Sequence, residues 1–263
     1  MEYENLILKK EEGVATIRLN RPKSFNSFNF DLGSDLEKSL EDCGKDPAVK
    51  AVILTGEGKA FCAGGDIAYF KKYFDSDPSE PFRQIIKKLN IAIITIRRMP
   101  KPVIAAVNGA AGGAGFSLAA ACDLRICAAS AIFRQAYTSI GMVGDGGWTL
   151  FIPLLIGFGR AMELMLLDQV IDARQALEWG LVNRVVDDAM LESTANEIAL
   201  KLSRGPAKAF AIAKENLNHA MMGLLERQLE LERAAMVKAA GTSDYIEGVN
   251  AFLEKRAARF TGK

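Results

Sequence analysis

The most informative stretch of the chain is KPVIAAVNGAAGGAGFSLAAACD, residues 101–123. It predicts a buried strand at residues 103–107, a polar break at Asn108, a glycine–alanine loop at residues 110–115 and a helix start at residues 116–121. A strand that passes through such a loop into a helix leaves backbone N–H groups of the first helical turn without partners. We therefore expect these N–H groups to face an oxygen atom that gains negative charge.

Three other interpretations of this stretch can be tested against its residues. A dinucleotide-binding G-x-G-x-x-G loop is disfavoured because Leu118 stands where the third glycine belongs. A membrane span is disfavoured by Asn108 inside the run, by Asp123 and Arg125 at its end, and by glycines that each cost a helix about 1 kcal/mol. Tight backbone packing would also select small residues, and this stretch alone leaves that interpretation open.

The rest of the chain alternates short strands with helices for about 190 residues and then becomes helical throughout, which predicts an α/β fold. Further strands are predicted at residues 5–8, 14–19, 51–54, 124–128 and 181–186, with loops at residues 56–65 and 131–147. Helices are predicted around Leu32, Leu36, Leu40 and Cys43, from Pro81 to before Lys101, from Trp148, and at residues 173–179, 195–202, 207–220, 223–240 and 244–259. We expect a core of residues 1–192 and a helical region of residues 193–263.

Composition limits the possible partners and the compartment. The 263 residues include 33 basic and 32 acidic side chains, and this balance removes the electrostatic case for nucleic acid or an acidic membrane as the main partner. The four cysteines lack C-x-x-C spacing and a nearby histidine, which predicts reduced thiols and no metal site. The charged N-terminus has no apolar signal segment, so we expect a cytoplasmic protein.

A second glycine-rich loop, KAFCAGGDI at residues 59–67, joins the first in a recognisable pattern. With RPKSFNSF at residues 21–28, DPAVKAVILTG at residues 46–56 and the segment of residues 161–186, these loops resemble the enoyl-CoA hydratase/isomerase (crotonase) superfamily over nearly the whole chain. GMVGDGG and the ending SDYIEGVNAFLEKRAARFTGK resemble, within it, the ring-epoxide isomerase group of phenylacetate catabolism.

The resemblance implies a crotonase-like ββα spiral core, with a C-terminal helical region that packs on the core and on neighbouring subunits of a homotrimer or hexamer. It implies an acyl-CoA substrate, of which coenzyme A is a part, and no separate cofactor. By motif alignment, the two backbone N–H donors that hold a thioester enolate are those of Gly65 and Ala114. The matching substrate-binding positions are Lys23, Phe25, Ala63, Asp66 and Ile67, and the tail residues Lys255 and Arg256 resemble groups that reach the coenzyme A phosphates.

The acid/base residues decide the reaction. Hydratases of the superfamily carry two glutamates where this chain has Ser117 and Tyr137, which we expect to bind substrate and which cannot act as carboxylate bases. Asp145 matches an aspartate of the isomerases and of dehalogenases, but Asn90 replaces the dehalogenase histidine, and the lone His219 lies in the tail. We therefore expect an isomerase that uses Asp145. A hydratase with a carboxylate elsewhere and a catalytically weak scaffold that binds coenzyme A or RNA are the alternatives.

Overall fold

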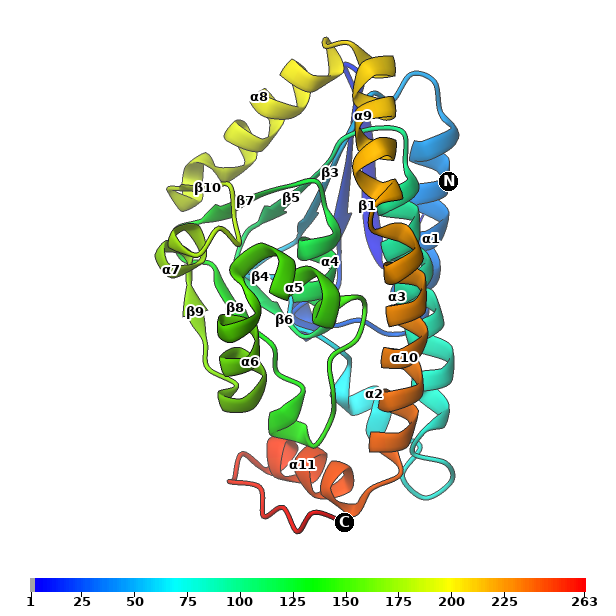
Figure 1. Cartoon of the computed structure of the whole chain (residues 1–263), viewed down its shortest axis with the longest axis vertical. Helices are drawn as coiled ribbons and strands as arrows, with labels where there is room; N and C mark the ends of the chain where they lie inside the picture. Colours follow the sequence, from blue (N-terminus) through cyan, green and yellow to red (C-terminus); the bar gives the residue numbers. More distant parts are fainter. Residues whose placement is uncertain (1–2) are drawn as a thin grey trace.

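The computed structural model describes residues 3–263 and contains two β-sheets (Figure 1). The larger sheet has the strand order β1-β2-β3-β5-β7-β10, and all its neighbours are parallel except β1 and β2. The smaller sheet has the order β4-β6-β8-β9, in which only β8 and β9 are antiparallel. The strands are β1 (Leu6–Glu11), β2 (Val14–Leu19), β3 (Ala51–Gly56), β4 (Ala60–Cys62), β5 (Val103–Val107), β6 (Ala110–Gly112), β7 (Leu124–Ala128), β8 (Ile132–Arg134), β9 (Ile171–Asp172) and β10 (Arg184–Val186).

Successive turns of the chain add one strand to each sheet and then a helix. The turn β3–β4 leads into α3, β5–β6 leads into α4, and β7–β8 leads into α5. Because β3, β5 and β7 are neighbours in one sheet and β4, β6 and β8 in the other, the turns stack as a ββα spiral. The expected fold class is therefore confirmed, and solved structures of the same fold bear it out below.

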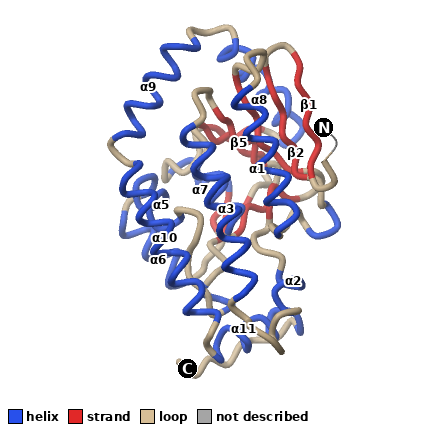
Figure 2. Tube along the Cα trace, turned by 90° about the vertical axis from the view of Figure 1, so that its right-hand side faces the viewer, coloured by secondary structure: helices blue, strands red, loops and turns tan. Residues whose placement is uncertain are grey.

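Helices cover both sides of this spiral and extend beyond it. Figure 2 shows the strands gathered in one half of the molecule, with α10 and α11 extending to the other end. The helices are α1 (Phe30–Lys45), α2 (Ile67–Lys71), α3 (Glu80–Arg98), α4 (Ala114–Ala121), α5 (Trp148–Ile156), α6 (Phe158–Leu167), α7 (Ala173–Glu178), α8 (Leu191–Ser203), α9 (Ala207–His219), α10 (Met222–Ala240) and α11 (Ser243–Glu254), with 3₁₀ turns η1 (Pro22–Ser24), η2 (Thr138–Ile140) and η3 (Asp188–Met190).

The long helices occur where the hydrophobic periodicity of the sequence predicts them. Leu32, Leu36, Leu40 and Cys43 of α1 are fully buried, as is the apolar face of α3. Asp172 caps α7, because its carboxylate accepts a hydrogen bond of 2.7 Å from the N–H of Gln175.

Short elements differ from the sequence-based expectations. Residues 56–65, 110–115 and 131–147, predicted as loop or irregular, each contain a strand of three residues (β4, β6 and β8), which is too short for an alternating pattern to reveal. Helix α4 begins at Ala114, two residues before the predicted start. The last helix ends at Glu254 rather than at residue 259, because Lys255 takes a left-handed φ of 55° and the chain then turns back.

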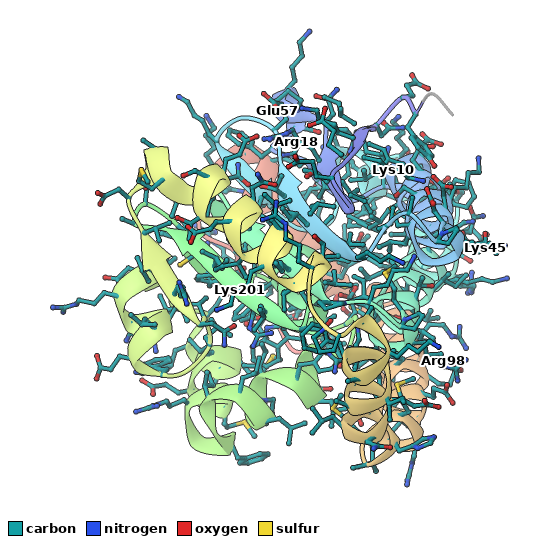
Figure 3. The ribbon with its side chains drawn as sticks, turned by 90° about the horizontal axis from the view of Figure 1, so that it is seen from above. Lys10, Arg18, Lys45, Glu57, Arg98 and Lys201 are labelled. Atoms are coloured by element: carbon teal, nitrogen blue, oxygen red, sulfur yellow. The ribbon has the colours of Figure 1, made fainter. Side chains whose placement is uncertain are left out.

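Helix α8 covers the outer face of the larger sheet, where Leu191, Ala195 and Ala199 pack on a cluster from β2, β3, β5 and β7. Arg18 of β2 forms an ion pair with the first turn of α8, because its Nη2 lies 3.1 Å from a carboxylate oxygen of Glu192. Its Nε also lies 3.6 Å from a carboxylate oxygen of Glu57 (Figure 3). The boundary expected between residues 192 and 193 therefore falls within α8.

Glycines of the central stretch allow two backbones to come together. A Cβ atom at Gly109 would lie 2.1 Å from the carbonyl oxygen of Lys59, and one at Gly115 would lie 2.0 Å from the carbonyl oxygen of Cys62. Neither glycine has a positive φ, so each is required by close packing rather than by backbone conformation. The packing interpretation left open above is thus correct for these two positions.

We expect Gly115→Ala to destabilise the fold severely, because the new methyl group can be accommodated only if β4 and α4 move apart. Gly159→Ala is the matched control: it lies in a helix with no atom within 4 Å of the added Cβ, and should leave the melting temperature unchanged or slightly raised. Equal melting temperatures for the two variants would contradict the packing argument.

Self-association stays a prediction. Amphipathic helices of the tail expose apolar side chains that need a surface to cover, among them Ile212, Leu217, Leu224 and Leu231, and α5 and α6 add Leu154, Phe158, Leu166 and Leu167. We expect light scattering at micromolar concentration to give three times the mass of one chain, or a multiple of that value. A monomer under these conditions would contradict it.

Candidate active site

A cavity of about 350 Å³ lies where the two glycine-rich loops meet α3, η2 and the tail helices. Apolar side chains from α2 and α3 form one wall, and α10 and α11 contribute Met236 and Phe252. Figure 1 shows α11 at the end of the molecule, beside the segment that precedes α5. The polar part of the lining includes Gly64, Gly65, Gly113, Ala114, Tyr137 and Asp145, and the apolar part includes Phe70, Phe82, Ile85, Ile86 and Leu89.

Phe28 holds the first glycine-rich loop by two backbone hydrogen bonds. Its N–H donates to the carbonyl oxygen of Gly64 at 2.7 Å, and its own carbonyl accepts from the N–H of Asp66 at 3.0 Å. In this parallel bridge, Phe28 forms hydrogen bonds with the residues before and after Gly65. The N–H of Gly65 itself therefore points away from Phe28. That direction leaves the N–H available to the cavity that Gly65 lines.

The second loop meets the first backbone to backbone. A Cβ atom at Gly113 would lie 3.5 Å from the Cα of Gly64, and Gly113 precedes α4 with a φ of 45°. Ala114 is the first residue of α4, so its N–H has no partner within the helix. Among residues 3–263, no hydrogen bond is donated by the N–H of either Gly65 or Ala114. The two unpaired donors thus lie on adjoining loops of one cavity.

Asp145 is the carboxylate of this cavity. It is only 6% exposed, and its Oδ1 accepts a hydrogen bond of 2.8 Å from the hydroxyl of Tyr137. Ser117 donates at 2.7 Å to the backbone carbonyl of Asp145, and its Oγ lies 3.2 Å from the hydroxyl of Tyr137. Gly146 and Gly147, which follow Asp145, have φ values of 62° and 81° that favour glycine. These contacts fix Oδ1 and leave Oδ2 without a hydrogen bond in the part of the chain that the structure describes.

Burial sets the acidity of the site. Desolvation raises the pKa of Asp145 to about 7; the hydrogen bond from Tyr137 acts against the rise, and the charge of Glu232 adds to it. The pKa of Tyr137 is raised well above its usual value, chiefly by burial and then by the charge of Asp145. Tyr137 is therefore a neutral donor at pH 7, while Asp145 changes charge near that pH.

The residues expected to bind coenzyme A divide into two groups. Ala63 and Ile67 line the cavity, while Lys23 and Phe25 are exposed on the neighbouring loop. The N–H of Ala63 donates a hydrogen bond of 3.0 Å to the carbonyl of Phe25, which joins the two loops. Asp66 caps α2 and pairs with Arg21 at 2.9 Å.

Two expected positions have local partners instead of an open approach to a ligand. Arg256 lines the cavity, but its guanidinium is paired with Glu247 and Glu254, so a phosphate would compete with both. Ser117 is fully buried behind Asp145 and does not line the cavity.

Glu232 of α10 is the functional candidate that sequence reasoning missed. Its buried carboxylate accepts hydrogen bonds from the N–H groups of Gly147 at 2.7 Å and Thr149 at 3.0 Å, directly after Asp145. The sequence does contain an indication of this role. Glu232 lies between Leu229 and Met236 on the buried face of α10, where a charged residue is unusual.

No group of three or more metal-binding side chains occurs among residues 3–263. Over the same residues, none of the helices is both long enough and apolar enough to cross a membrane.

The chain is similar to known proteins in sequence and in fold. The sequence profile described as "Enoyl-CoA hydratase/isomerase" matches residues 9–263. The chain is 39% identical to the 1,2-epoxyphenylacetyl-CoA isomerase of Escherichia coli, with 99% of each chain covered, and 38% identical to the crotonyl-CoA hydratase of Syntrophomonas wolfei over all of both chains. It is 32% identical to an enoyl-CoA hydratase of Mycobacterium avium subsp. paratuberculosis with a solved structure (TM-score 0.89; 99% of this chain and 100% of that one covered).

The pKa of Asp145 predicts how the site affects stability. Since it is raised to about 7 in the folded state, the folded chain holds this proton more tightly than the unfolded chain, and stability is lost as pH rises through about 7. Asp145→Asn removes that penalty, so its melting temperature should exceed that of the wild type more at about pH 8 than at about pH 5. Asp75→Asn, at an exposed aspartate, is the control and should show no such trend. A constant difference for Asp145→Asn would contradict the raised pKa.

Proposed function

The chain belongs to the enoyl-CoA hydratase/isomerase family, and within it we propose that the protein is an acyl-CoA isomerase whose proton carrier is Asp145. The observation that carries this proposal is the number of carboxylates at the cavity. Asp145 is the one carboxylate among the described residues that line it. One base that removes a proton and returns it elsewhere suits an isomerisation, which neither gains nor loses atoms.

The proposed reaction of a 3-enoyl-CoA proceeds in two proton transfers. Oδ2 of Asp145 takes a proton from C2, and the electron pair of that C–H bond moves into the thioester, whose oxygen becomes an enolate conjugated with the C3–C4 double bond. The N–H groups of Gly65 and Ala114 donate hydrogen bonds to this oxygen, and donors of this kind typically contribute about 2.7–4 kcal/mol each. Asp145 then returns the proton to C4, which leaves a C2–C3 double bond.

The environment of Asp145 supports this role. A carboxyl group with a pKa of about 7 is half ionised at neutral pH, so it can both accept and return a proton. Tyr137 holds one oxygen at 2.8 Å and leaves the other for the substrate. We infer that Tyr137 and Ser117 orient Asp145, in place of the two glutamates that hydratases of the superfamily carry.

The acyl group is proposed from the lining. Phe70, Phe82, Ile85 and Leu89 make one wall apolar, which favours an uncharged linear or ring-containing acyl chain. The similarity to the isomerase of Escherichia coli supports a ring epoxide of phenylacetyl-CoA as the second substrate class, beside a linear 3-enoyl-CoA.

A hydratase is the second candidate, and the similarity to the crotonyl-CoA hydratase of Syntrophomonas wolfei favours it. Such a mechanism needs a second carboxylate to hold water. Glu232 is buried next to the segment that carries Asp145, but it does not line the cavity, and both of its oxygens already accept hydrogen bonds. This arrangement supports the isomerase over the hydratase.

Substitution of Asp145 separates the two candidates. Asp145→Asn keeps size and the hydrogen bond from Tyr137 but removes basicity, so 3-enoyl-CoA isomerisation should fall by about 10²–10⁴-fold. Binding should survive: an acyl-CoA at about 100 times its Kd should still stabilise the variant by about 2.7 kcal/mol in a melting experiment. Asp75→Asn should retain full activity. Rapid isomerisation by Asp145→Asn, or rapid hydration of crotonyl-CoA by the wild type, would overturn the proposal.

The pH profile provides an independent check. Because the ionised form of Asp145 is the base, kcat/KM should rise with pH through about 7 and then level off. A profile that is flat between about pH 5 and 8 would contradict Asp145 as the base.

A further inference from the structure

Glu232 is a buried carboxylate that the proposed reaction does not use. It is 3% exposed on α10, far along the chain from the glycine-rich loops. Oε2 accepts from the N–H of Gly147, and Oε1 accepts from the N–H of Thr149 and from its hydroxyl. Burial raises the pKa of Glu232, and these hydrogen bonds act against the rise, because each is donated to a carboxylate oxygen. In its ionised form, Glu232 places a negative charge next to the segment that carries Asp145.

The contacts of Glu232 start two residues after Asp145. Gly147 has a left-handed φ of 81°, and Thr149 is the second residue of α5, so Glu232 binds N–H groups that α5 leaves unpaired. Gln228, one turn earlier on α10, donates to the Thr149 hydroxyl at 2.7 Å. The backbone N–H groups of Gly147 and Thr149 and the hydroxyl of Thr149 are thus attached to α10 through the side chains of Glu232 and Gln228.

We propose, resting on the isomerase function above, that Glu232 is a positioning residue for Asp145: it fixes the turn after Asp145 from α10 and holds a like charge beside it. Glu232 does not touch the cavity, so it acts only through Asp145. The tail of the chain then supplies part of the acid/base apparatus, in addition to covering the core.

The effect of Glu232 on the pKa of Asp145 can be judged against the other charged and titratable groups around Asp145. Tyr137 faces it from the segment before η2, and Cys62 interacts with it weakly from β4. Arg134 and Arg256 are the cations of the cavity wall, but Asp168 neutralises the first, and Glu247 and Glu254 neutralise the second. Ser117 and Asn90 are neutral. Glu232 is therefore the anionic neighbour that raises the pKa of Asp145 beyond the effect of burial.

Glu232→Gln tests the proposal by kinetics. The amide keeps the size but turns one donor toward the N–H of Gly147 or Thr149, so the turn should shift. We expect kcat to fall about tenfold or more, because small displacements of a catalytic group are costly, while KM changes little. The rise of kcat/KM should move to lower pH. A wild-type kcat and an unchanged pH profile would overturn the role of Glu232.

Two control variants separate positioning from general instability. Leu229→Ala, one turn away on the buried face of α10, should lower the melting temperature and leave the pH profile where it is. Thr149→Val removes one hydrogen bond to Glu232 but keeps its charge, so it should lower kcat without moving the profile. If Leu229→Ala shifts the profile as Glu232→Gln does, the role is structural and the proposal fails.

A thermodynamic cycle needs no assumption about the reaction. Asp145→Asn and Glu232→Gln relieve the same repulsion, so their effects on unfolding free energy should be non-additive at about pH 8 and closer to additive at about pH 5. Additivity at both pH values would overturn the electrostatic part of the proposal, in which the charge of Glu232 acts on Asp145. If Asp145→Asn is inactive while Glu232→Gln behaves as the wild type, only the role of Glu232 fails. If Asp145→Asn is fully active, the proposed function itself fails.

Discussion

Two glycine-rich backbones approach each other so closely that no side chain fits between them. A Cβ atom at Gly115 would lie 2.0 Å from the carbonyl oxygen of Cys62, so β4 and α4 can be neighbours only without a side chain there. The same approach brings Gly64 against Gly113 and leaves the N–H groups of Gly65 and Ala114 on one cavity. Packing and the proposed oxyanion site therefore have the same cause, and the glycines serve both.

The spiral supplies these loops, and the tail completes the cavity. In each turn a loop leads from the strand of the smaller sheet into the next helix, and Gly65 and Ala114 lie in this position after β4 and β6. Asp145 comes from the following turn, and its position depends on Tyr137 within that turn and on Glu232 from α10. A base that is buried yet can be ionised needs such fixed polar partners, because a loose carboxylate would be solvated and would lose its raised pKa.

Sequence reasoning was accurate where a pattern extends over several turns of helix or matches a motif. The buried faces of α1 and α3 followed from hydrophobic periodicity. The strands β4, β6 and β8 have three residues each, and their existence depends on pairing across the chain. Asp145 was found by resemblance, whereas Glu232 could not be connected with it, because only the packing of α10 against α5 brings them together.

The exchange of substrate hydrogen with deuterated water measures proton removal by Asp145 without a complete turnover. Phenylacetyl-CoA offers acidic protons next to the thioester and no double bond to move, so its exchange reports enolate formation alone. The account predicts that the wild type exchanges these protons at a rate that rises with pH through about 7, and that Asp145→Asn, although it still binds the thioester, does not. Equal exchange by the two proteins would place the base elsewhere and contradict the account.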